Sequence, residues 1–163
     1  MMDSAAPFSI RPFCKADGPA LLALFRETVR RVNSSDYDAE QVHAWASDEI
    51  DAAAWTARFA GRFAAVAERD GVPVGFTELE DDGHIDRFFV AADQQRCGVG
   101  RRLMTAILDE ARRRGIARLH ADVSITARPF FAAQGFVELA RQTVVSRGVE
   151  FVNYQMERVL GSA

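Results

Sequence analysis

A short loop containing two glycines, set between a strand and a helix, constrains the fold of this chain more than any other feature. The apolar run 84–90 ends just before Asp93, and a helical pattern begins near Gly100. The connecting segment contains Gly98 and Gly100 and is followed by two arginines. A helix that starts in this way leaves backbone N–H groups unpaired at its positive end. The sequence therefore predicts an anion site here, suited to a diphosphate.

The periodicity of apolar residues on either side of this loop predicts an α/β (α+β) protein. Strands are expected at 8–11, 63–68, 73–79, 84–90, 118–123, 136–145 and 150–156. Helices are expected at 17–32, 38–45, 52–60, 100–114 and, after a cap at 124 or 126, up to 135. A helix separates 84–90 from 118–123, so these two strands should run parallel. We expect one domain spanning 1–163, with a mixed, mostly antiparallel sheet of six to seven strands and helices on both faces.

Three local signals refine these boundaries. Asp17 precedes an apolar helical face and is expected to be its N-cap. Asp38 with Gln41 three residues later has the pattern of a capping box. Ile85 and Phe88 are out of step with a period of two, so a bulge between them would let both face the core.

Composition excludes several classes of protein. With 163 residues and a net charge of −3, the chain lacks the basic surface of a general nucleic-acid binder. No run approaches the roughly 18 apolar residues of a membrane span. Residues 1–6 lack the features of a signal peptide, and Cys14 and Cys97 have no metal-binding spacing. We therefore expect a cytoplasmic protein with free thiols and no metal site.

Two well-known nucleotide-binding loops do not fit the segment around Gly98. A Rossmann fingerprint requires a third glycine where this chain has Leu103, and it does not follow an antiparallel meander. A Walker loop requires Gly-Lys-Ser/Thr, and the segment contains no lysine. By spacing alone, the glycines either shape a turn at an arginine-rich helix start or cradle a phosphate group.

Two motifs resemble those of the GNAT acetyltransferase superfamily. Residues 95–100, Gln-Arg-Cys-Gly-Val-Gly, match the motif Q/R-x-x-G-x-G/A. Residues 127–136, Ala-Arg-Pro-Phe-Phe-Ala-Ala-Gln-Gly-Phe, are similar to A-x-x-x-Y-x-x-x-G-F. The expected order of elements is also that of the family, so the resemblance covers nearly the whole chain. The sequence is most similar to small bacterial members.

The resemblance implies that acetyl-CoA is the donor, with its diphosphate against the backbone N–H groups of residues 96–101. Arg96, Arg101 and Arg102 would add charge-assisted contacts, including contacts to the 3′-phosphate. In this family the two parallel strands splay apart, so the pantetheine arm would pair with the backbone of 88–90, where an N–H polarises the thioester carbonyl. The predicted cofactor-binding residues are Phe88, Phe89, Val90, Gln95, Arg96, Cys97, Gly98, Val99, Gly100, Arg101, Arg102, Ser124 and Phe131.

The position at which many relatives carry a proton-donating tyrosine is Phe131 in this chain. Phenylalanine cannot donate a proton, and general acid catalysis is typically worth about 10²–10⁴ in rate. Tyr154, in the last expected strand, is the substitute candidate for the acid. The alternative is that the thiolate leaves unaided, which a thiol pKa near 8.5 makes tolerable.

Relatives often use a carboxylate on a central strand as the general base, acting through water. The candidates here are Glu78, Glu80, His84 and Asp86. His84 lies eleven residues before Gln95, where some relatives that modify proteins place a glutamate, and imidazole titrates near neutrality. We expect His84 or Glu78 to be the base. Asp86, at the expected bulge, is a candidate to contact the substrate, to act as the base or to hold the strand.

The acceptor pocket is expected to form from residues 33–60 and the last hairpin, with Tyr37 and Trp45 in its wall. Packing of Trp45 and Trp55 within a helical core is the alternative. We predict direct transfer of the acetyl group to an amine of a small molecule, because Cys97 lies too far from the thioester to act as a nucleophile. Two alternatives are a non-catalytic acyl-CoA-binding sensor and a protein or peptide N-acetyltransferase. The identity of the amine and the formation of a homodimer stay open.

Overall fold

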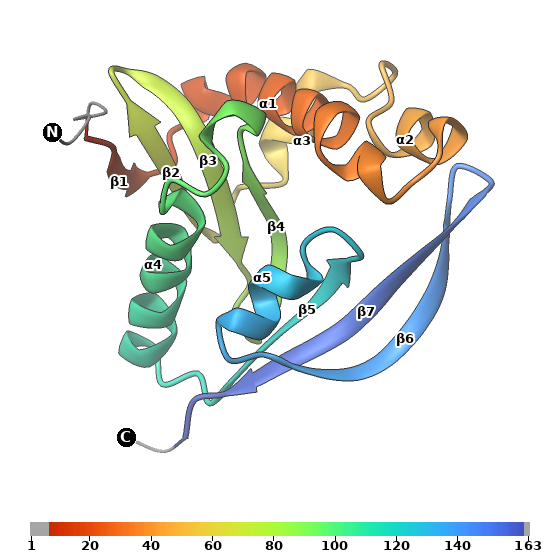
Figure 1. Ribbon diagram of the computed structural model, residues 1–163. Coiled ribbons are helices and arrows are strands. Elements are labelled where there is room, and N and C mark those ends of the chain that lie inside the picture. The colour runs from red at the N-terminus through yellow and green to blue at the C-terminus, as the bar shows by residue number, and fades with distance from the viewer. Residues whose placement is uncertain (1–6, 162–163) are drawn as a thin grey trace, which may run out of the picture.

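Two antiparallel sheets form the framework of the computed structural model, which describes residues 7–161 (Figure 1). The first sheet contains, in spatial order, β1 (Ser9–Pro12), β2 (Phe63–Arg69), β3 (Val72–Leu79) and β4 (Ile85–Val90). The second contains β5 (Arg118–Ser124), β7 (Val149–Val159) and β6 (Val137–Ser146). Residues 1–6, on which the expectation of no signal peptide rests, lie outside the described part.

The two sheets are joined where β4 begins. His84 and His120 form an isolated parallel bridge, and the His120 N–H donates to the Gly83 carbonyl at 3.0 Å. Beyond this bridge the two strands share no ladder, so they separate toward their C-terminal ends. The mixed, mostly antiparallel arrangement with a central parallel, splayed strand pair is therefore confirmed.

Helices cover both faces of the first sheet. One face packs against α1 (Gly18–Arg31), α2 (Ala39–Trp45) and α3 (Ala52–Ala57), and η2 (Asn33–Ser35) contacts α1 and α2. The other face packs against α4 (Val99–Arg113), and α5 (Arg128–Ala133) lies beside β5 (Figure 1). Along β2, Val66 faces the α1 side while its neighbours Ala65 and Ala67 face α4, because side chains alternate along a strand. Within residues 7–161, no helix has the length and apolar character needed to cross a bilayer.

Both predicted N-cap residues lie at a helix start, but only one of them caps its helix through the side chain. The box at α2 is confirmed, because the Gln41 N–H donates to Asp38 and the Asp38 N–H donates to Gln41, both at 2.8 Å. Asp17 occupies the N-cap position of α1, as predicted, but its side chain makes no capping bond to that helix. Its carboxylate instead accepts two bonds from Arg11 at 2.8 Å and one from the Cys14 N–H. These contacts lower the pKa of Asp17 to about 2.

The expected bulge lies in β4. Thr77 pairs with Phe88 and Leu79 pairs with Ile85, so β4 has one more residue than β3 between these pairs. Ile85 and Phe88 both pack against the α4 side of the core, as predicted. The extra residue changes the alternation within β4 and places two adjacent charged side chains, Asp86 and Arg87, opposite one residue of β3.

Candidate active site

The loop that follows β4 presents the start of α4. Gly98 has φ +87° and immediately precedes the helix, and the first backbone bond of the helix runs from the Arg102 N–H to the Gly98 carbonyl at 3.1 Å. The N–H groups of residues 98–101 therefore have no partner within the helix. Gln95 holds the loop against the strand end, donating from Nε2 to the Val90 carbonyl at 2.7 Å. This geometry is that of an anion site at a helix N-terminus.

The two glycines of the loop are required for different reasons. A Cβ on Gly100 would lie 3.1 Å from Cε1 of Phe130, so a larger residue would push α4 away from α5. A Cβ on Gly98 would meet no atom within 4 Å, but its positive φ strains any other residue. Gly98 thus leaves the space in front of the helix start open.

A cavity of about 1450 Å³ extends from this loop into the gap between β4 and β5. Ten of the predicted cofactor-binding residues line it: Phe88, Phe89, Val90, Gln95, Arg96, Gly98, Gly100, Arg101, Ser124 and Phe131. The other three do not. Cys97 is exposed, with its thiol near the Gln95 carbonyl. The Val99 side chain is buried, and the Arg102 guanidinium lies over the ring of Phe8.

Aromatic residues form the far end of the cavity, which lies beneath α1, α2 and the β6–β7 hairpin. Tyr37, Trp45 and Trp55 all line it. The rings of Tyr37 and Trp45 are 5.4 Å apart and edge to face, and Phe151 contacts both. The structure thus brings Tyr37 and Trp45 to one wall, as the sequence analysis expected. Trp55 lies apart from them, against Phe25.

The Tyr37 hydroxyl joins the N-terminal helices to the second sheet. The β5–β7 ladder ends at the pair Ser124 and Asn153. At the next position along the two strands, Ile125 and Val152 do not bond to each other directly. The Tyr37 hydroxyl lies between them, accepting from the Ile125 N–H at 2.9 Å and donating to the Val152 carbonyl at 2.7 Å. Burial raises the pKa of this hydroxyl, so it stays protonated as a donor.

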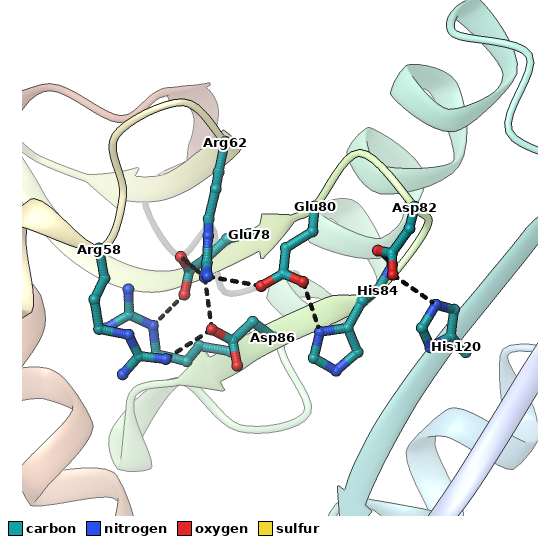
Figure 2. A network of polar contacts seen from close by, with 9 residues as sticks. Arg58, Arg62, Glu78, Glu80, Asp82, His84, Asp86 and His120 are labelled. Carbon is teal, nitrogen blue, oxygen red and sulfur yellow. Dashed lines mark hydrogen bonds and ion pairs between the residues drawn. The ribbon is translucent and has the colours of Figure 1, made fainter.

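Glu78 belongs to a buried ionic network and is not an open carboxylate that could act as a catalyst. Its side chain is fully buried and accepts a hydrogen bond from Arg62 at 3.0 Å (Figure 2). It also accepts a hydrogen bond from the Nε of Arg87. Glu78 does not line the cavity. The structure therefore argues against the prediction that Glu78 is the base, because both carboxylate oxygens are committed to arginines.

His84 also lies outside the cavity. Its Nδ1 is 3.1 Å from Glu80, and its ring is 5.2 Å from that of His120 at the joint between the sheets (Figure 2). The bridge that joins the sheets fixes His84 at the closed end of the splay, whereas the thioester site was expected at the open end. The position of His84 does not support a role as the base.

Asp86 is the only one of the four candidate bases that lines the cavity. Its Oδ2 accepts from Arg58 at 2.7 Å and from Arg62 at 2.6 Å (Figure 2). Burial acts to raise the pKa of Asp86, but the hydrogen bond from Arg62 and the charges of the neighbouring arginines outweigh it. The net pKa is below the ordinary value, so Asp86 is ionised at neutral pH.

Tyr154 was the substitute candidate for the acid, and it does not line the cavity. Its ring packs in the core of the second sheet, with the Arg128 guanidinium 4.2 Å from the ring centroid. The position of Tyr154 in the middle of β7, opposite Val123, turns it toward that core. Phe131 is buried at the cavity wall and has no hydroxyl.

Three polar side chains on the cavity wall have unpaired atoms, and the sequence analysis did not single out two of them, Arg87 and Thr126, as functional residues. Arg87, Trp55 and Thr126 each carry a buried nitrogen or oxygen without a hydrogen-bond partner among the described residues. The sequence gives no spacing signal for them. The bulge was the one available clue, since it indicated an irregular orientation at Arg87. In residues 7–161, no three His, Cys, Asp or Glu side chains gather as a metal site would require.

Comparison with known families agrees with this geometry. The family model described as "Acetyltransferase (GNAT) domain" matches residues 33–158. The chain belongs to this family, and the acetyltransferase class of enzyme expected from its two motifs is confirmed.

Individual relatives extend the match to almost the full length. The chain is 33% identical over 147 residues to the "Uncharacterized N-acetyltransferase YafP" of Escherichia coli K12, covering 90% of this chain and 93% of that protein. The structure of the "GCN5-Related N-acetyltransferase: Aminotransferase, Class-II" from Rhodopseudomonas palustris has a TM-score of 0.91 at 35% identity, covering 98% and 99% of the two chains. The fold is shared with the paia N-acetyltransferase of Thermoplasma acidophilum, solved with coenzyme A, at a TM-score of 0.77 and 18% identity, covering 94% and 99%.

Proposed function

We propose that this protein transfers the acetyl group of acetyl-CoA directly to the amine of a small molecule. The single observation that carries the proposal is a continuous cavity, with a helix N-terminus at one end and aromatic and charged side chains at the other. Family membership supports acetyl-CoA as the donor. The fold is also that of yncA from Salmonella typhimurium, whose structure contains acetyl-CoA.

The donor end fits a coenzyme A diphosphate. The free N–H groups of residues 98–101 point from the helix start, and Arg96 and Arg101 line the adjacent cavity wall. Among the described strands, β4 pairs only with β3 beyond the bridge, so its other edge is open to a pantetheine arm beside Phe88 and Phe89. A backbone N–H there would stabilise the negative charge that develops on the thioester oxygen.

The acceptor end favours a small molecule over a polypeptide. Three bonds close it by joining the N-terminal helices to β7 and the β6–β7 turn. Besides the bond from Tyr37 to β7, Gln41 donates to the Glu150 carbonyl and Arg147 donates to the Ala44 carbonyl, each at 2.9 Å. A polypeptide would need an open groove at this position.

Asp86 is the group we assign to the acceptor amine. The amine nitrogen attacks the carbonyl carbon of the thioester, the C–S bond breaks, and coenzyme A leaves as its thiolate. An alkylamine is mostly protonated at pH 7, so it must first lose a proton. Asp86 is charged at neutral pH and binds the ammonium form, which loses one proton to water before the attack. The nitrogen loses its second proton to water as the C–S bond breaks and the amide forms. The Thr126 hydroxyl, which has no protein partner within residues 7–161, is available to donate a hydrogen bond to the departing thiolate.

Calorimetry with acetyl-CoA, followed by thiol release with a panel of small amines, tests the proposal. We expect acetyl-CoA to bind and at least one amine to accelerate thiol release over the rate in water alone. Binding without acceleration by any small amine, but with acceleration by peptides, would assign the alternative protein-modifying activity. Binding without turnover of any acceptor would favour the sensor, and absence of binding would refute the donor site.

A further inference from the structure

Two residues on the acceptor wall bury hydrogen-bond donors that no protein group satisfies. Nη1 and Nη2 of Arg87 and Nε1 of Trp55 have no partner among residues 7–161. Arg87 is 5% exposed and Trp55 is 3% exposed, and both line the cavity. Buried polar groups are nearly always hydrogen-bonded, and leaving a charged one unpaired is particularly costly. Both residues border the cavity, but the three nitrogens have almost no accessible surface, so a bound group reaches them only when a neighbouring side chain of the wall moves aside.

The surroundings of Arg87 hold its guanidinium in one orientation. Its Nε bonds to Glu78, which is itself fixed by Arg62. Two aromatic rings also pack against it: the ring centroids of Trp55 and Phe59 lie 4.1 Å and 4.3 Å from its Cζ and 6.2 Å from each other. Aromatic rings satisfy the faces of a guanidinium by cation–π attraction, but they accept no in-plane hydrogen bond. Among residues 7–161, no oxygen or nitrogen therefore accepts a hydrogen bond from Nη1 or Nη2.

A carboxylate is the small group that best matches these donors. It only accepts hydrogen bonds, it is planar, and its two oxygens suit the fork of a guanidinium. The indole N–H of Trp55, whose ring touches the same guanidinium, adds a third donor to this part of the wall.

The charge of the surrounding network also favours a zwitterion. Three arginines and three acids interact there, so the network is neutral: Arg58, Arg62, Arg87, Glu78, Glu80 and Asp86. A simple ammonium bound at Asp86 would add one uncompensated positive charge to a half-buried site. An acceptor that also carries a carboxylate adds no net charge, so its desolvation costs less.

We propose that the acceptor is an amine that also bears a carboxylate, as a free amino acid does, and that Arg87 and Trp55 bind this carboxylate. The inference rests on the proposed acetyl transfer and specifies its substrate class. Asp86 receives the ammonium end of the acceptor and Arg87 its carboxylate end, so the acceptor lies across the bulge of β4.

The test compares free amino acids with their amides, a pair that differs little in size but differs in charge. Thiol release is measured for each pair with the wild-type protein and with Trp55→Phe, which keeps an aromatic face on Arg87 but removes the indole N–H. For the preferred amino acid we expect kcat/KM to exceed that of its amide by about 10²-fold. Trp55→Phe should lower this ratio about tenfold.

The other tryptophan of the chain provides a matched control. Trp45→Phe alters the same cavity without touching the unpaired donors, so it should leave the ratio of acid to amide unchanged. Arg87→Met should reduce the ratio to about one, and Trp55→Phe keeps the test informative if Arg87→Met fails to fold.

The inference is overturned if no free amino acid exceeds its amide, or if both tryptophan variants change the ratio equally. Such a result with continued turnover of simple amines would leave the proposed acetyl transfer intact. If no acceptor is turned over, calorimetry of free amino acids with the coenzyme A complex decides. Binding that Trp55→Phe weakens supports the carboxylate subsite even though the transfer proposal fails, and absence of binding overturns the subsite.

Discussion

The donor end and the acceptor end of the cavity are built in different ways. The donor end is nearly continuous in sequence, from Phe88 to Arg101, and its binding groups are mainly backbone N–H groups at the start of a helix. The acceptor end is assembled from side chains of α1, α2, α3, the β4 bulge and the β6–β7 hairpin. A backbone site depends on local conformation, whereas a side-chain site depends on the placement of every element that contributes to it. Substitutions at the two ends should therefore fail in different ways.

The largest expected effect is on the free energy of unfolding, from a substitution in the buried ionic network next to the acceptor end. Glu78→Gln removes the charge that two arginines share in the buried network, and breaking a buried ion pair typically costs about 3–5 kcal/mol. We expect the free energy of unfolding, measured by urea denaturation, to fall by that amount. Glu27→Gln, in the exposed pair with Arg31, should change it by less than about 1 kcal/mol. Equal effects of the two substitutions would show that the network does not support the acceptor end.

Asp86→Asn should give the next largest effect, and on catalysis rather than on donor binding. Losing the charge that binds the acceptor amine is expected to lower kcat by about 10²–10³-fold, while calorimetry shows an unchanged Kd for acetyl-CoA. His84→Ala should keep the wild-type rate, because His84 lies outside the cavity.

The dependence of the rate on pH also distinguishes Asp86 from His84 as the base. The pKa of Asp86 is below its ordinary value, so the group stays charged from neutral pH down to well below pH 5. Between pH 6 and pH 9 the rate should then rise only as the acceptor amine loses its proton. A break near neutrality that disappears in His84→Ala would restore His84 as the base.

Gly98→Val should affect the donor end alone. Valine is strained at φ +87°, and its side chain would occupy the open space before α4. We expect the Kd for acetyl-CoA to rise roughly 10- to 100-fold, since several charge-assisted contacts to the diphosphate depend on this loop. Gly71→Val is the matched control, because Gly71 has φ +78° and also has no atom within 4 Å of its Cβ position. A similar loss of affinity in both variants would attribute the effect to strain.

The smallest effect is expected from Tyr37→Phe, which removes the hydroxyl between β5 and β7. Loosening the closure of the acceptor end should raise the KM for the acceptor about fivefold to tenfold, because one net hydrogen bond is worth about 1 kcal/mol. The KM for acetyl-CoA should stay constant. A rise in both values would mean that Tyr37 supports the whole cavity rather than one end.

Several features were predictable from the sequence because their causes are local. The capping box at Asp38 and Gln41 requires only the three-residue spacing along one helix. The bulge followed from the apolar pattern of Ile85 and Phe88 within one strand. Asp17 shows the limit of local reasoning, because Arg11 on β1 takes the carboxylate that would otherwise cap α1.

The catalytic candidates on the strands show the same limit at the functional site. Glu78, His84 and Asp86 all lie on or next to neighbouring strands, and their residue types are all compatible with a base. Only the packing of Arg62 and Arg87 reveals that Glu78 is fully engaged. Only the bridge to His120 shows that His84 lies at the joint of the sheets rather than in the cavity.

The sequence alone determined the order of the elements, the glycine-containing helix start and the family, because each of these depends on residues close together in the chain. The tertiary structure decided which charged side chains face the cavity, which donors lack a partner and how the acceptor end closes. These properties depend on contacts between segments far apart in sequence, such as Tyr37 with Val152. Burial and ion pairing arise from such contacts, and they determine whether a given carboxylate or guanidinium is free to bind a substrate.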